Sequence, residues 1–324
     1  MDPLNMSKAE REHLISQLQN PNTGRSLEEL LKTDEMLSGA ESQRLRTFFS
    51  TNHMEPSRDL DMYGRYVMMG DLETIQLLYN DSIVEHRSKC DTDNTARSAA
   101  TQEIYHKCWG PTRVPIYNLI LLSTLILPPS WKEHLEIARW LIDEAKVPVD
   151  GKDLSGSAAL HHAISTKPTF DPEYAQMLYD AGNIVTQRNR YGGVPAHEML
   201  QTWDPTNREV VRMAAKALQW YLDHGGNLNI KDSDGVSPHQ SVNNTKKLAR
   251  AGIQMETWQV VDADDKRRKR LAGKVCTFCS REPQGDVKLL KCSKCKVASY
   301  CSGGAPCQKT DWPHHKTICK KPAA

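Results

Sequence analysis

The sequence predicts a mostly α-helical chain that ends in a small cysteine-rich module, and three observations carry this prediction. A turn signal, consisting of Asp or Asn, two further residues and Gly, recurs with Gly156, Gly192 and Gly235 spaced 36 and 43 residues apart. Apolar residues at helical spacing precede two of these turns and end on a Gly. Seven of the nine cysteines lie between Cys276 and Cys319. Repeats of this length are typical of stacked helical units, and clustered cysteines are typical of metal sites.

Composition limits the class of protein. The 324 residues suggest about two folded units at roughly 150 residues each. The 42 basic and 40 acidic side chains leave a net charge of +2, so no global field attracts nucleic acid or anionic lipid. The first residues lack the pattern of a secretory signal, and the longest apolar stretch, Ile116 to Leu127, is too short to span a bilayer. We therefore expect an intracellular protein without a membrane partner, in the nucleus or the cytoplasm.

Residues 1–61 are expected to form an N-terminal helical cap. The segments Ser7 to Glu10 and Ser26 to Glu29 both match the capping box, in which Ser begins a helix and Glu bonds back to it. Leucines supply one buried stripe: Leu14, Leu18, Leu27, Leu30, Leu31 and Leu45. This segment predicts structure that covers the end of the following domain.

Residues 62–255 predict paired helices. The segments 173–184 and 217–228 have apolar residues at helical spacing and a Gly stop, and the segments 135–142 and 70–78 supply two earlier copies of this helix. The order of helix, Gly stop, turn and helix resembles the ankyrin-repeat family, whose units read Asp-x-x-Gly-x-Thr-Pro-Leu-His-x-Ala. The resemblance implies a helical solenoid with a concave surface that binds a protein.

The repeats depart from the family pattern to different degrees. The copy at Asp153 keeps the Asp, Gly, Leu, His and Ala of the pattern but has Ala-Ala in place of Thr-Pro. The copy at Asn189 keeps Pro195 and its His, and the last copy, at Asp232, has a short second half at residues 245–252. The recurring histidines are His161, His197 and His239. The resemblance implies that they bond within the turns, too far apart to share a zinc ion at bond lengths of about 2.1 Å.

Residues 256–274 are expected to form a charged linker, in which Asp262, Asp264 and Asp265 precede five bases, Lys266 to Arg270. Two interpretations remain open. Five consecutive bases match a nuclear import signal or a nucleic-acid patch. Acids followed by bases also suit a solvated helix whose last turn is cationic.

Residues 275–320 supply four pairs of metal ligands. The spacings are Cys-x2-Cys twice, Cys-x5-Cys and His-x3-Cys, formed by Cys276, Cys279, Cys292, Cys295, Cys301, Cys307, His315 and Cys319. A Cys-x2-Cys turn directs both sulfurs at one tetrahedral ion, and His315 lies one helical turn before Cys319. Eight ligands predict two structural Zn²⁺ ions. His315 is preferred to its neighbour His314, which is expected to face solvent, because of its spacing from Trp312 and the Lys that follows it.

The residues around these ligands indicate a family. Tyr300-Cys301, Cys307-Gln308, Trp312 and His315-Lys316 resemble the MYND zinc finger, which ends Tyr-Cys, Cys-Gln, Trp-x-x-His-Lys-x-x-Cys. The resemblance implies that pairs one and three hold one zinc ion and that pairs two and four hold the other. The third pair is normally Cys-x3-Cys, so two extra residues are expected to loop out at Gly303-Gly304.

Both modules imply a non-enzymatic adaptor that binds protein partners, with a transcriptional co-regulator as one form of this function. Closed structural zinc sites have no open position to activate water, so no catalytic residue is assigned. The seven thiolates neutralise much of the basic charge of the finger, which argues against nucleic acid as its partner.

The family resemblance also implies a site for a proline-containing peptide. Segment 296–300, which includes Ser299, is expected to offer an edge for strand addition, with Gln308 and Trp312 one turn apart on the following helix. In the alternative interpretation Trp312 fills the small core between the ligand pairs.

The alternative function is that of a lysine methyltransferase of the SET type, a class in which MYND fingers also occur. Residues 51–56 weakly resemble the Asn-His-x-Cys-x-Pro stretch of SET domains but lack its Cys. The repeat assignment leaves no β-rich domain of about 130 residues around them. A nuclear and a cytoplasmic adaptor would differ only in location. The basic run Lys266 to Arg270 is the one sequence feature that bears on this difference.

Overall fold

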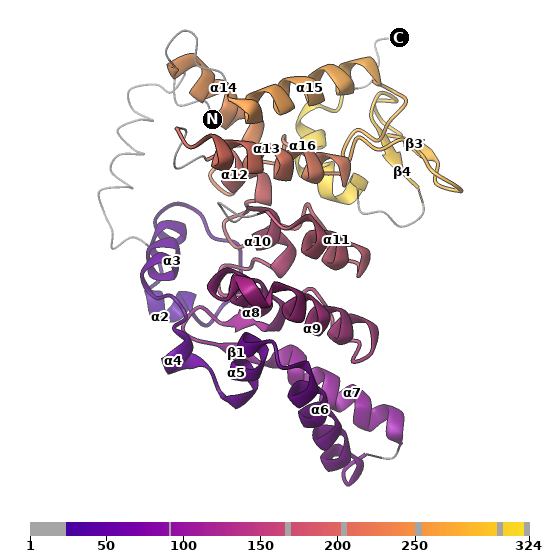
Figure 1. Ribbon diagram of the computed structural model, residues 1–324. Helices are drawn as coiled ribbons and strands as arrows, with labels where there is room; N and C mark the ends of the chain where they lie inside the picture. The colour runs from indigo at the N-terminus through magenta and orange to yellow at the C-terminus, as the bar shows by residue number, and fades with distance from the viewer. Residues whose placement is uncertain are drawn as a thin grey trace. The chain divides into compact units, whose positions relative to one another are not determined.

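A computed structural model describes residues 24–90, 92–165, 170–201, 206–249, 255–302 and 307–320. Helices predominate in it, and a small module with two Cys/His clusters follows them, which confirms the predicted fold class (Figure 1). The capping box at Ser7, the leucines Leu14 and Leu18 and the Gly303-Gly304 loop lie outside the described residues. Within the described ranges, no helix is long and apolar enough to cross a membrane.

The chain divides into two compact units. The first contains the described residues up to Ala163 with Glu173–Ile184 and Arg188–Gly192, and the second contains Ile164–Pro172, Val185–Gln187 and the rest. The domain boundaries that the sequence suggested, at residues 61, 255 and 274, stay predictions.

The N-terminal part of the first unit is helical as expected. Helix α2 (Leu27–Leu30) begins at Ser26, whose hydroxyl accepts from the Glu29 amide while the Glu29 carboxylate accepts from the Ser26 amide. This is the predicted capping box. Two further helices follow, α3 (Gly39–Thr51) and α4 (Pro56–Asp59). The predicted leucines in this region pack into one cluster with Leu154 and Tyr191.

The remainder of the first unit consists of packed helices and one short hairpin. In order these are α5 (Met62–Met69), α6 (Leu72–Arg87), α7 (Asp93–His106), β1 (Cys108–Trp109), β2 (Val114–Pro115), α8 (Ile116–Ile126), η1 (Pro128–Ser130), α9 (Trp131–Asp143), α10 (Ala159–Ser165) and α11 (Pro172–Asp180). Helix α5 packs against α6, α6 against α7, and α8 against α9. The last residues of α10 and the first residue of α11 belong to the second unit.

Each predicted turn has the geometry that its Asp or Asn and its Gly suggest. Asp153 Oδ1 accepts from the amides of Ser155 and Ser157 at 2.9 and 3.1 Å, and the Gly156 amide donates to the Asp153 carbonyl. Gly156 has φ +77°, a backbone conformation that residues with a Cβ rarely adopt. The turns at Asn189 and Asp232 repeat both features, with φ +70° and +83° at their glycines. The sequence pattern is therefore a requirement of the turn.

His197 and His239 form side-chain hydrogen bonds, and none of the three turn histidines joins a group of metal ligands in the described chain. His197 accepts from the Val194 amide at Nδ1 and bonds the Val236 carbonyl through Nε2 at 3.1 Å. His239 instead bonds Asp265 at 2.8 Å.

The second unit contains the last helices and the cysteine-rich module. Its elements are α12 (Pro195–Met199), α13 (Arg208–Asp223), α14 (Pro238–Leu248), α15 (Glu256–Arg270), β3 (Leu289–Lys291), β4 (Ser299–Cys301) and α16 (Cys307–Ile318). Where a short second half was expected at residues 245–252, α14 continues to Leu248. The next helix, α15, packs against α13.

Helix α15 occupies most of the segment expected as a linker. It is helical, as one of the two interpretations requires, but it is not solvated on every side, because Trp258, Val261 and Asp264 are buried. These residues lie three apart and share one face of the helix. Apolar packing, rather than charge alone, therefore holds this segment in place.

Candidate metal centre

Two clusters of four ligand atoms lie in the cysteine-rich module, each with all four atoms within 4.8 Å of one another. The first cluster combines the Cys276–Cys279 turn after α15 with Cys301 at the end of β4 and Cys307 at the start of α16. The second combines the turn after β3 with the end of α16, through Cys292, Cys295, His315 and Cys319. The structure thus brings together the same two sets that the family resemblance implies. The side chain of His314 lies outside the described part of the chain.

Distances within the clusters fit tetrahedral zinc. Bonds of about 2.3 Å from zinc to sulfur place two sulfurs ~3.8 Å apart on the edge of a tetrahedron. The Sγ atoms of Cys279 and Cys301 are 3.7 Å apart, and those of Cys292 and Cys319 are 3.8 Å apart. His315 Nε2 lies 3.4 Å from Cys292 Sγ. Both clusters therefore match the donor set and the dimensions of structural zinc sites, and the finger takes two zinc ions.

The backbone around the second cluster favours thiolates, the form that binds metal. Hydrogen bonds from the amides of Cys295 and Lys294 lower the pKa of Cys292 to about 7. The amides of Ala298 and Val297 lower the pKa of Cys295 in the same way. Turns of the Cys-x2-Cys type supply such amides as a consequence of their shape.

Tyr300, rather than Trp312, fills the core of the finger. Tyr300 is 1% exposed, its hydroxyl donates to Asp311 at 2.7 Å, and its ring meets the edge of His315 with centroids 5.9 Å apart. Trp312 is 45% exposed. In the sequence Tyr300 is a family marker and the end of the expected edge segment, although a large aromatic side chain between two ligand pairs is itself a signal for a core position.

Hairpin β3–β4 has one closed edge and one open edge. Hydrogen bonds join Lys288 to Ser302 and Cys292 to Ala298, so Leu289 and Lys291 direct their backbone groups away from β4. No described residue bonds those outward groups of β3.

The expected edge at Ser299 is not open. Thr277 donates its amide to the Ser299 carbonyl at 2.7 Å, and its hydroxyl accepts from the Ser299 amide at 2.9 Å. Ser299 is also buried, whereas Gln308 is exposed on α16. The expectation failed because the first ligand turn, distant in sequence, pairs with β4 and uses its outer edge.

Two arginines of the basic run fix α15 to its neighbours: Arg267 attaches the first ligand turn to α15, and Arg268 attaches α15 to the segment that follows α13. Asp264, 5% exposed, accepts from Arg267 at 2.8 Å and from Arg268 at 2.6 Å. Arg267 also donates to the Ser280 carbonyl at 2.9 Å, and Arg268 donates to the Gly226 carbonyl at 3.1 Å. We call these five residues the arginine clamp. The clamp could not be predicted from the sequence, because a run of bases does not show which of its members are buried.

A further bond supports the same attachment. The buried side chain of Asn227, which follows the Gly stop of α13, donates to the Phe278 carbonyl at 2.9 Å. Phe278 lies between the two cysteines of the first ligand turn. The finger is therefore packed on α13 and α15 rather than tethered by a flexible segment.

Comparison with known proteins identifies the module. The family model for the MYND finger matches residues 276–319, so this segment is a MYND zinc finger. Histone-lysine N-methyltransferase SMYD3 of Homo sapiens is 48% identical over 59 residues, which cover 17% of this chain and 13% of that protein. SET domain and MYND-type zinc finger protein 6 of Schizosaccharomyces pombe is 47% identical over 47 residues, or 14% of this chain and 9% of that protein. The chain thus spans about a tenth of the length of these relatives.

Among solved structures, an ankyrin repeat domain from Acinetobacter baumannii AYE is similar to this chain. The match covers 63% of this chain and 97% of the other, at 15% identity and a TM-score of 0.36. A similarity this weak carries no argument, so the helical repeat rests on the turn geometry described above.

Proposed function

We propose that this chain is a non-enzymatic adaptor whose finger and helical repeats each bind a protein partner. The carrying observation is the contrast within the finger between closed metal clusters and an open strand edge. Each cluster has four ligands, seven of the eight residues are buried, and a tetrahedral site so filled has no position for a reacting water. The zinc ions therefore serve folding, and the exposed surface serves binding.

The proposed finger site lies at the outer edge of β3 and on α16. An extended peptide added to Leu289 and Lys291 gains main-chain hydrogen bonds, and Leu290 between them is 56% exposed. Exposed Trp312 offers an aromatic surface suited to proline, and Gln308, one turn earlier, offers an amide to the peptide backbone. Ser299 supports the hairpin from within in this arrangement.

Methyl transfer is the alternative function, because several of the relatives, SMYD3 among them, are named as lysine methyltransferases. Their similarity is confined to the finger. The described residues form two sheets of two strands each, which is not the β-rich architecture of a SET domain. Isothermal titration of the full chain with S-adenosylmethionine tests this alternative: the adaptor function predicts no binding, and saturable binding contradicts it.

A peptide experiment tests the adaptor function at the finger. The full chain is screened against proline-containing peptides, and Trp312→Ala and Gln308→Ala are expected to lose the selected peptide while metal analysis still finds two zinc ions. Leu248→Ala, a change at an 83% exposed residue of α14, is the matched control and should bind normally. If no peptide binds the wild type, or if both finger variants bind as the wild type does, the proposed site is wrong.

A further inference from the structure

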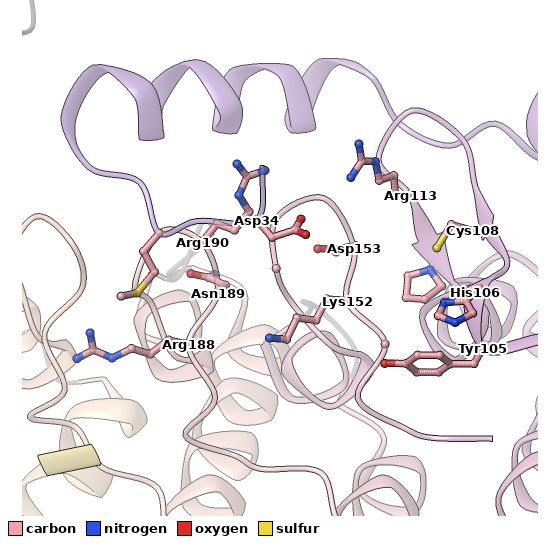
Figure 2. Close-up of a pocket in the computed structure, with 14 residues that line it drawn as sticks. Asp34, Tyr105, His106, Cys108, Arg113, Lys152, Asp153, Arg188, Asn189 and Arg190 are labelled. Atoms are coloured by element: carbon pink, nitrogen blue, oxygen red, sulfur yellow. The ribbon is translucent and has the colours of Figure 1, made fainter. Parts of the chain in front are cut away.

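A polar pocket of ≈ 650 Å³ lies in the first unit, among the turns that connect its helices. Its walls include four charged residues from distant parts of the chain, Asp34, Arg113, Lys152 and Arg190, together with Asp153 (Figure 2). In Figure 2 Arg190, Arg113 and Lys152 lie around Asp34 and Asp153. Arg188 also lines the pocket, so four cations and two aspartates contribute to its walls.

Among the residues that the structure describes, Arg113, Lys152 and Arg190 have no carboxylate partner. Arg190 donates to the carbonyls of Leu30, Leu154 and Glu35, which are neutral acceptors. Arg113 donates to the Leu31 carbonyl. Within the described chain, no ion pair involves Arg113, Lys152 or Arg190, and burial lowers the pKa of Arg190. The guanidinium of Arg190 is therefore a buried charge that its own surroundings do not neutralise.

The two aspartates of the pocket differ in availability. Asp153 is buried, accepts turn amides at Oδ1 and bonds His162 at Oδ2 with a separation of 2.6 Å. Its carboxylate is thus already surrounded by donors. Asp34 is exposed and is the other acidic residue that lines the pocket; it does not belong to the turn of Asp153. Positive charge consequently exceeds negative charge in the pocket.

We propose that this pocket binds carboxylate side chains of an acidic peptide segment in a protein partner. Exposed Lys152 and Arg113 make the contacts, and buried Arg190 supplies positive potential beneath them. Phosphate sites usually add backbone amides, and the turn amides here already donate to Asp153. This inference rests on the proposed adaptor function, for which it names the class of partner that the repeats bind.

Fluorescence anisotropy of the full chain tests the proposal with a labelled peptide of alternating glutamate and glycine. The same peptide with glutamine in place of glutamate should bind at least about tenfold more weakly. Lys152→Gln and Arg113→Gln should each weaken binding about fivefold, and added salt should weaken it further. Asp34→Asn should tighten binding, because it removes the opposing acid. Arg190 is left unchanged because its hydrogen bonds hold the N-terminal segment in place.

Controls separate this site from a general attraction to basic surface. Lys132→Gln removes an exposed cation outside the pocket and should leave the affinity unchanged. If Lys152→Gln and Lys132→Gln bind alike, the pocket is not the site. If a phosphoserine-containing peptide or inorganic phosphate binds in a Lys152-dependent manner and the glutamate peptide does not, the carboxylate assignment is overturned.

The finger provides an internal reference for the same protein samples. Lys152→Gln should retain the proline-containing peptide, and Trp312→Ala should retain the acidic peptide. If the wild-type chain binds the proline-containing peptide but not the acidic peptide, this inference is refuted and the adaptor function is not.

Discussion

The helical first unit and the zinc finger are stabilised by different means. The first unit buries many large apolar side chains completely, among them Leu45, Val67, Ile75, Leu119 and Leu141. The finger has few such side chains, with Phe278 and Tyr300 as its large buried aromatics, and relies on two metal clusters. Apolar packing is lost in increments, whereas a tetrahedral site that loses one ligand loses most of its affinity. Stability should therefore respond gradually in one region and abruptly in the other.

The largest expected effect is the loss of a ligand from the second cluster. Cys292→Ser should unfold the finger, because structural zinc supplies on the order of 10 kcal/mol of folding free energy in such modules. Metal analysis should fall from two zinc ions to one or none, while circular dichroism should keep the helical signal of the first unit. Cys108→Ser, at an exposed cysteine outside both clusters, is the control and should retain two zinc ions. Two zinc ions in Cys292→Ser would contradict the assignment of this ligand.

The next largest effect is expected at the arginine clamp. Arg268→Ala leaves buried Asp264 with one partner fewer and should lower the free energy of unfolding of the second unit by about 4 kcal/mol. Arg267, which holds the Ser280 carbonyl of the first ligand turn, shares Asp264 with Arg268, so the variant should also release one zinc ion to a chelator faster. Urea denaturation and a colorimetric zinc assay measure the two effects.

Lys269→Ala is the matched control, since Lys269 is an exposed neighbour on the same helix. It should change the unfolding free energy by less than about 0.5 kcal/mol. Equal effects of the two substitutions would show that the bonds of Arg268 to Asp264 and Gly226 do not stabilise the second unit.

A turn glycine should give an intermediate effect in the first unit. A Cβ at Gly156 would lie 2.9 Å from the backbone nitrogen of Arg190, in addition to the strain of φ +77°. We expect Gly156→Val to lower stability by about 3 kcal/mol. Gly182→Val has a similarly unfavourable φ, +101°, but open space around its Cβ, and should cost about 1 kcal/mol. Thermal denaturation followed by circular dichroism distinguishes them, and an equal loss would mean that the close contact is unimportant.

The smallest effect is expected from the removal of a surface carboxylate, Glu41, in the first unit. Hydrogen bonds from the Arg25 side chain and amide lower the pKa of Glu41 to about 2. The contribution of the Glu41 carboxylate to the free energy of unfolding is therefore fully present above pH 4.5 and is lost as the pH falls toward 2. Since solvent screens this pair, Glu41→Gln should cost at most about 0.5 kcal/mol at pH 7. Chemical denaturation should show the wild type and the variant converging as the pH falls, and a constant difference would contradict the assignment.

Local patterns were sufficient to identify the metal ligands and the turns. Ligand pairs three to six residues apart mark the eight residues that bind metal, and the Asx–Gly pattern determines a turn whatever surrounds it. Which two pairs share an ion was implied by the family resemblance, because the two pairs of each site are separated in the sequence. Burial was less predictable. Asp264 and Arg268 look like solvated charges in a linear sequence, and only their packing on α13 reveals a clamp. A core position was the favoured interpretation for Trp312 in the sequence, but Tyr300 fills the core and Trp312 is exposed.

The sequence by itself determined the helical character of the chain, its turn positions and the eight ligand residues, because each depends on residues close together in the chain. The family resemblance implied how the four ligand pairs combine into two zinc sites, and the structure brings those two sets together. Tertiary structure decided which strand edge of the finger is open, which bases of α15 are engaged, and which cations meet in the pocket near Lys152. These features depend on contacts between segments up to 160 residues apart, such as Arg190 with Leu30. Spacing along a chain carries no information about which distant segment will occupy a given edge or neutralise a given charge.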